Sequence, residues 1–124
     1  MTKKLIEINN LSKSYKYKDS KLSVLHNLKF EIKEKEIISI IGPSGVGKST
    51  FLNIVGLLDT FDVGNYYFNE NDVTKLSNNK INIFRNKYIG FVHQFFHLIP
   101  ELTILENVAI PKMIMNNNKK ESYD

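Results

Sequence analysis

The residues best suited to chemistry lie in one short run in the first half of the chain. They follow the spacing G-x-x-x-x-G-K-S of a phosphate-binding loop and comprise Gly42, Pro43, Ser44, Gly45, Val46, Gly47, Lys48, Ser49 and Thr50. Glycine lets consecutive backbone N–H groups turn inward around an anion, and we expect a Cβ at Gly45 or Gly47 to obstruct that turn. Lys48 adds a positive charge, and the Ser49 hydroxyl can bind Mg²⁺. The run predicts a site for a nucleoside triphosphate.

The segments beside this loop are those that a phosphate-binding loop requires. Residues 37–41 form an apolar, β-branched run typical of a strand buried on both faces. Residues 51–58 are too evenly apolar for a surface helix, so we expect a buried helix there. Its N-terminus would direct unsatisfied N–H groups and the positive end of the helix dipole at the phosphates. This context argues against a glycine-rich turn that binds nothing.

The hydrophobic pattern predicts the other elements of an α/β domain. Residues 5–8 and 24–32 alternate like half-exposed antiparallel strands, with a polar surface loop or hairpin at 13–20 between them. Further along, we predict turns at 62–65 and 69–72, a short strand at 66–68, a helix at 79–87, a buried strand at 88–92 and a polar loop at 116–120.

A capping box marks one further helix. Thr103 and Glu106 have the T-x-x-E spacing, so a helix should begin there and carry Val108, Ile110 and Met113 inward. Pro111 should kink or end it, because proline lacks the N–H that an interior helical position donates.

Composition limits the class of protein. The 124 residues suffice for one small domain, and the net charge of +4 is scattered without a basic tract, so no nucleic-acid partner is predicted. Cysteine is absent, which excludes disulfides and thiolate metal sites. The sequence shows no export signal and no apolar run of about 18 residues, so we expect a soluble protein and treat the sequon at Asn10 as fortuitous.

Several separated segments together resemble the ATP-binding subunits of ABC transporters. Residues 88–108, YIGFVHQFFHLIPELTILENV, resemble the Q-loop region of these ATPases, and residues 11–15, LSKSY, are similar to their adenine-stacking segment. Residues 24–28, VLHNL, are similar to the strand that follows. Essentially the whole chain is covered. Within the family the resemblance is greatest to the lipoprotein-releasing type, with the macrolide-export and cell-division types close behind.

The resemblance implies ATP and Mg²⁺ as cofactors and gives roles to single residues. Residues 42–50 would hold the phosphates, Lys48 would also be catalytic, and Ser49 would bind the metal. Tyr15 would stack on adenine, with Tyr17 as a competing candidate. Gln94 would reach both Mg²⁺ and the attacking water, and would sense a membrane partner.

The resemblance also implies a fold, partners and a location. The fold would be an α/β P-loop NTPase core with an N-terminal antiparallel β subdomain: strands at about 1–36, the P-loop core at about 37–94, and the Q-loop with the start of a helical subdomain at about 94–124. The partners would be membrane-spanning subunits and a second copy of the ATPase in a homodimer. The protein would lie in the cytoplasm, on the cytoplasmic face of the inner membrane, and would power lipoprotein release.

The chain departs from the family by lacking the LSGGQ signature, an apolar strand ending in Asp-Glu, and a switch histidine. We therefore expect an N-terminal part, truncated before the signature motif and the Walker B strand, that binds nucleotide weakly and hydrolyses little or none alone. One alternative is a catalytically incompetent remnant that at most binds nucleotide or a membrane subunit. A GTPase would need N-K-x-D, whereas residues 86–89 read NKYI.

The apolar run from 91 to 111 permits two interpretations. It is either core, or Phe95, Phe96 and Leu98 line a groove for a short helix of a membrane subunit. His93 and His97 have a spacing that binds metal on a helix, but Pro100 argues against a helix here, and we expect neither to be a ligand.

Overall fold

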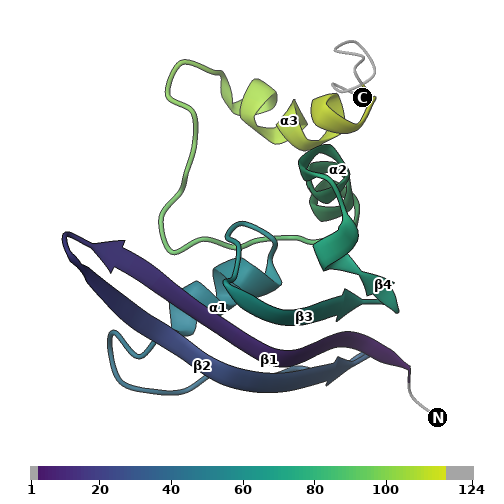
Figure 1. The fold of residues 1–124 in the computed structure, drawn as a ribbon. Coiled ribbons are helices and arrows are strands. Elements are labelled where there is room, and N and C mark those ends of the chain that lie inside the picture. Colours follow the sequence, from purple (N-terminus) through teal and green to yellow (C-terminus); the bar gives the residue numbers. More distant parts are fainter. Residues whose placement is uncertain (1–2, 117–124) are drawn as a thin grey trace. The chain divides into compact units, whose positions relative to one another are not determined.

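The computed structural model describes residues 3–116, and the chain forms two compact units, residues 1–76 and 77–124. The first unit contains strands β1 (Lys4–Tyr17), β2 (Ser20–Lys33), β3 (Val63–Phe68) and β4 (Asn71–Asp72), helix α1 (Lys48–Val55) and a 3-10 helix η1 (Val73–Lys75) (Figure 1). The second contains helices α2 (Asn78–Tyr88) and α3 (Ile104–Asn116).

The four strands of the first unit form one antiparallel sheet in the order β2-β1-β3-β4. In β1, Ile6 and Ile8 are buried, and so is Leu11, although an odd spacing would place it on the opposite face of a regular strand. A register shift between Ile8 and Leu11, where Asn10 has φ 54°, brings the side chains to one face. The predicted hairpin is confirmed, but its strands extend through most of residues 13–20.

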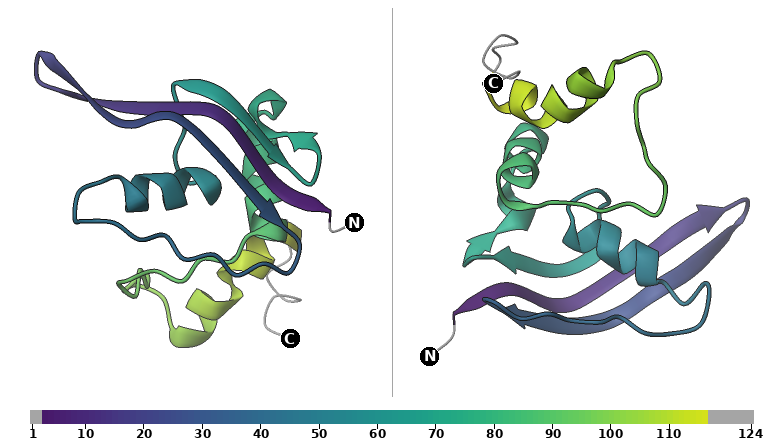
Figure 2. Two further views of the ribbon diagram at one scale, coloured as in Figure 1. Left: turned by 90° about the horizontal axis from the view of Figure 1, so that it is seen from below. Right: turned by 180° about the vertical axis from the view of Figure 1, so that it is seen from behind.

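Helix α1 lies across one face of this sheet (Figure 2). Phe51 and Ile54 of the helix are buried, and Phe51 meets Phe30 of β2 edge to face at 4.9 Å. The hydroxyl of Tyr66 in β3, a fully buried residue, donates to the Val55 carbonyl at 2.7 Å. These contacts fix the helix against the strands, and with it the loop that precedes the helix.

Three expectations for the first unit are wrong. Residues 37–41 form no strand, and Ile37 is 99% exposed. A strand needs a neighbouring backbone for its hydrogen bonds, and none of the described residues pairs with this segment. Helix α1 is not buried on all sides, since Leu52 is exposed. Residues 62–65 are largely strand, because β3 begins at Val63; the strand expected at 66–68 and the turn at 69–70 are confirmed.

In the second unit the predicted helices are confirmed. Helix α2 extends the predicted span by one residue at each end. The capping box before α3 is formed: the Thr103 amide donates to Glu106 Oε2 at 2.9 Å, and the Glu106 amide donates to Thr103 Oγ1 at 3.2 Å. Of the two effects expected of Pro111, a kink or an end to the helix, the second is wrong, because α3 continues through Pro111. The Pro111 carbonyl accepts a hydrogen bond from Asn86 of α2 at 3.0 Å.

Two further expectations for the second unit fail. Val108 is exposed, and Ala109 is the buried residue of α3 instead. The strand expected at 88–92 is absent from the described residues: α2 runs through Tyr88, and residues 89–92 are irregular, with all but Ile89 exposed. Of the loop expected at 116–120, Asn116 ends α3, and the remainder lies outside the described residues.

Candidate phosphate-binding site

The loop at residues 42–50 has the backbone that an anion cradle requires. Gly45 and Gly47 have φ of 77° and 103°, in the left-handed region that favours glycine. Gly47 is the N-cap of α1, and its carbonyl accepts the first helical hydrogen bond, from Phe51 at 2.9 Å. The N–H groups of Lys48, Ser49 and Thr50 precede that bond and have no partner within the helix. They are therefore available for an anion.

The two left-handed glycines are required for different reasons. A Cβ at Gly45 would meet no atom of the chain within 4 Å, so within the chain it is the positive φ that favours glycine there. A Cβ at Gly47 would lie 2.9 Å from Val24 Cγ1 and 3.1 Å from Leu25 Cδ2, so the loop also packs closely on β2. The open space at Gly45 and the close packing at Gly47 fit a loop that accommodates a ligand on one side and rests on the sheet on the other.

Lys48 reaches back over its own loop. Its Nζ donates to the carbonyls of Gly42 at 2.8 Å and Pro43 at 2.7 Å. Lys48 thus lies against its own loop and lines an open pocket of about 270 Å³. That pocket is lined by Val24, Ser44, Gly45, Gly47, Lys48, Ser49 and Thr50. A phosphate group in this pocket would meet backbone N–H groups, a hydroxyl and an ammonium together.

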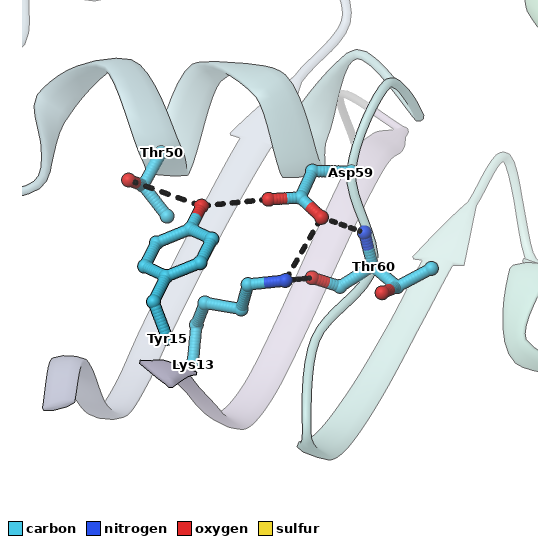
Figure 3. A network of polar contacts seen from close by, with 5 residues as sticks. All are labelled: Lys13, Tyr15, Thr50, Asp59 and Thr60. Atoms are coloured by element: carbon cyan, nitrogen blue, oxygen red, sulfur yellow. Dashed lines mark hydrogen bonds and ion pairs between the residues drawn. The ribbon is translucent and has the colours of Figure 1, made fainter. Parts of the chain in front are cut away.

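A polar network joins this site to strand β1 (Figure 3). The Tyr15 hydroxyl donates to Asp59 Oδ2 at 2.7 Å and lies 3.5 Å from the Thr50 hydroxyl oxygen in α1. Lys13 Nζ donates to Asp59 Oδ1 at 2.8 Å and to the Thr60 carbonyl at 2.7 Å. The structure therefore places Tyr15 next to the helix that follows the loop. Tyr17 lies at the hairpin end of β1 and is exposed.

The electrostatics of the network centre on Asp59. Burial opposes ionisation of its carboxyl, but hydrogen bonds from Lys13, Tyr15 and the Thr60 amide outweigh burial, so the Asp59 pKa lies below its ordinary value. Lys13 is a buried charged side chain, although the sequence predicted a polar surface segment there. Sequence reasoning missed Lys13, Asp59 and Val24. For Lys13, its place two residues before Tyr15 on one strand was a signal; for Asp59 there was none.

Gln94 lies in the second unit, in an exposed irregular segment, whereas the loop and Tyr15 belong to the first. Beside it, the His93 ring stacks on Phe91 and lies 4.4 Å from the His97 ring, centroid to centroid. Residues 3–116 contain no group of three or more His, Cys, Asp or Glu side chains suited to a metal ion. Phe95, Phe96 and Leu98 are exposed, so the interpretation of these three residues as core is wrong.

Comparison with known proteins defines the class. Residues 25–124 match the family model described as ABC transporter, and the chain belongs to that family. It is 41% identical over 120 residues to the lipoprotein-releasing system ATP-binding protein LolD of Buchnera aphidicola, covering 97% of this chain and 53% of that protein. It is 42% identical over 117 residues to YvrO of Bacillus subtilis, an uncharacterized ABC transporter ATP-binding protein, covering 94% and 51%.

The fold has a solved counterpart. The ATP-binding cassette MJ0796, in a dimeric structure of a post-hydrolysis state bound to ADP and Pi, superposes with a TM-score of 0.85 at 39% identity, over 95% of this chain and 52% of that one. The expected ABC ATPase fold is thereby confirmed. The chain spans about half the length of the curated relatives it matches. Within residues 3–116, no helix has the length and apolar character to cross a membrane.

Proposed function

We propose that this chain is the ATP-binding part of an ABC transporter ATPase, which couples ATP binding and hydrolysis to transport. The observation that carries the proposal is the loop at 42–50, where left-handed glycines, the first turn of α1 and Lys48 line one open pocket. The solved relative with this fold is described as bound to ADP and Pi, which supports an adenine nucleotide as the ligand.

Each predicted site residue has a role in this proposal. Residues 42–50 hold the phosphates through backbone N–H groups and Lys48 Nζ, Ser49 binds Mg²⁺, and Tyr15 stacks on the adenine ring. Gln94 of the second unit would contribute a side-chain oxygen to the metal and orient the attacking water. Mg²⁺, when bound, neutralises negative charge on the phosphates during transfer. Tyr15 is favoured over Tyr17 because its hydroxyl is tied to Asp59.

We propose that ATP hydrolysis requires the whole protein, and that these 124 residues by themselves bind nucleotide without hydrolysing it. Phosphoryl transfer depends on positioning and on a group that orients or deprotonates water, and the family's signature motif and Asp-Glu pair do not occur among these residues. In this proposal strands at about 1–36, the P-loop core at about 37–94 and the Q-loop segment at about 94–124 form one part of a nucleotide-binding domain. A phosphate-release assay on the chain should show little or no turnover; turnover like that of a complete ATPase would contradict this.

We propose lipoprotein release from the inner membrane as the transported process. The relatives named for lipoprotein release support this proposal. The ATPase would act as a homodimer on the cytoplasmic face, and the exposed Phe95, Phe96 and Leu98 would contact a membrane subunit. The similarity to YvrO keeps another export ATPase as the alternative. Depleting the protein in its own cells should retain lipoproteins in the inner membrane; normal lipoprotein sorting would favour the alternative.

The nucleotide site itself is tested by calorimetric titration with MgATP. Lys48→Ala should weaken binding about tenfold to a hundredfold, because charge-assisted hydrogen bonds of about 1.5–3 kcal/mol are lost. Lys29→Ala removes the same charge from an exposed position of β2 and should leave affinity unchanged. Equal affinities for the Lys48 variant and the unaltered protein would refute the assignment of the loop.

A further inference from the structure

A partly buried ion pair lies beside the Tyr15 side chain (Figure 3). The Lys13 side chain is 8% exposed and the Asp59 side chain 29%, and their charged atoms are 2.8 Å apart. A lysine this buried loses its hydration, so it needs a strong partner, and both its carboxylate and its carbonyl contacts are short. The pair joins the middle of β1 to the segment after α1, across 46 residues of sequence.

Both members of the pair also contact Tyr15. Lys13 Nζ lies over the Tyr15 ring, 4.8 Å from its centroid, and Asp59 Oδ2 accepts a hydrogen bond from the Tyr15 hydroxyl at 2.7 Å. One carboxylate therefore uses one oxygen for the lysine and the other for the tyrosine. The ring is held at its edge and covered on one face, yet Tyr15 remains 38% exposed. Part of the tyrosine therefore stays accessible to a planar ligand.

We propose that Lys13 and Asp59 are positioning residues, which hold the Tyr15 ring beside α1 in the orientation that receives the adenine base. The inference rests on the proposed function and adds a determinant of base recognition that does not touch the phosphates. A side chain fixed before binding loses less conformational freedom when a ligand arrives, so the pair contributes to affinity through the ring. Thr50, 3.5 Å from the Tyr15 hydroxyl, ties the same ring to the phosphate-binding helix.

The test compares the full protein's affinity for MgATP with its affinity for magnesium triphosphate, which has the phosphates without the base. Tyr15→Phe keeps the ring and removes the hydroxyl. It should weaken ATP binding about three- to tenfold, because that factor corresponds to the net free energy of one hydrogen bond. Its triphosphate affinity should not change. Asp59→Asn should cause a loss for ATP alone, and the two changes together should cost less than the sum of their separate losses, because both disrupt the hydrogen bond between Tyr15 and Asp59.

Lys13 is tested by a pair of variants. Lys13→Met removes the charge and should lower the preference for ATP over triphosphate, whereas Lys13→Arg keeps a charged donor and should restore most of it. Tyr17→Phe is the matched control, because this exposed tyrosine lies outside the network, and it should bind both ligands as the unaltered protein does. Circular dichroism confirms that each variant is folded. If Lys13→Met does not fold, the Tyr15→Phe and Asp59→Asn results decide.

The outcomes separate this inference from the proposed function. Equal losses of ATP and triphosphate affinity in the Asp59 variant would mean that the pair only maintains the fold, and would overturn the inference. Unchanged ATP affinity in both Tyr15→Phe and Asp59→Asn would overturn it as well. An unaltered protein that binds neither ligand would instead refute the nucleotide site itself.

Discussion

Replacing Gly47 by alanine should be the most damaging single methyl addition in the phosphate-binding loop. The residue has φ of 103°, and the new Cβ would lie 2.9 Å from Val24 Cγ1 and 3.3 Å from the Val24 carbonyl oxygen. Backbone strain of this kind costs about 1–2 kcal/mol. Crowding into a packed site costs about 1–3 kcal/mol more. We expect the free energy of unfolding to fall by about 2–5 kcal/mol.

Gly45→Ala is the matched control for the crowding. Gly45 also has a positive φ, of 77°, but a Cβ there would meet nothing within 4 Å. Only the strain should remain, about 1–2 kcal/mol. The difference between the two variants, about 1–3 kcal/mol, therefore isolates the contact between the loop and β2.

Urea unfolding of the full protein, followed by far-UV circular dichroism, measures both losses. Val24→Ala should recover part of the loss in the Gly47 variant, because it removes the methyl group that the new Cβ meets. If Gly47→Ala is no more destabilising than Gly45→Ala, or if Val24→Ala recovers nothing, the loop does not rest on β2 as described and the reasoning is refuted.

Three further predictions follow from single contacts. Gly64→Ala should lower the free energy of unfolding by about 2–4 kcal/mol in urea denaturation, because its Cβ would lie 2.7 Å from the backbone of β1 at a φ of 124°. Thr103→Ala should raise the amide exchange rates in the first turn of α3 and cost about 1 kcal/mol, because it removes half of the capping box. Asp59→Asn should destabilise the protein at neutral pH, and its deficit relative to the unaltered protein should shrink as pH falls. The folded-state pKa of Asp59 lies below the ordinary 3.8, so its stabilisation is present above that value and is lost as pH falls through the lower folded pKa.

Two of these predictions have a control variant. Gly90→Ala adds a methyl group where nothing lies within 4 Å, and should be close to neutral. Ser77→Ala alters the N-cap of α2, whose side chain makes no capping hydrogen bond, and should not change exchange in that helix. A stability deficit of Asp59→Asn that stays constant between pH 7 and pH 3 would contradict the depressed pKa, and neutral behaviour of Gly64→Ala would contradict the close approach of β3 to β1.

Much of the secondary structure could be predicted because its causes are local. The hairpin of β1 and β2 follows from alternation, and α3 begins where Thr103 and Glu106 satisfy each other's backbone, within four residues. The segment at 37–41 shows the limit of this reasoning. Its apolar pattern is typical of a buried strand, but a strand exists only when another backbone pairs with it, and none of the described residues does.

The residues of the candidate site likewise fall into those that local sequence predicts and those that tertiary contacts bring together. The sequence by itself determined the loop at 42–50, because its glycines, Lys48 and the following helix are contiguous and act through their own backbone. Only the tertiary structure decided that Lys13 is buried, that Asp59 holds both it and Tyr15, and that the loop rests on Val24. These contacts join residues far apart in the chain, and no spacing rule encodes them, because packing of α1 on the sheet brings them together.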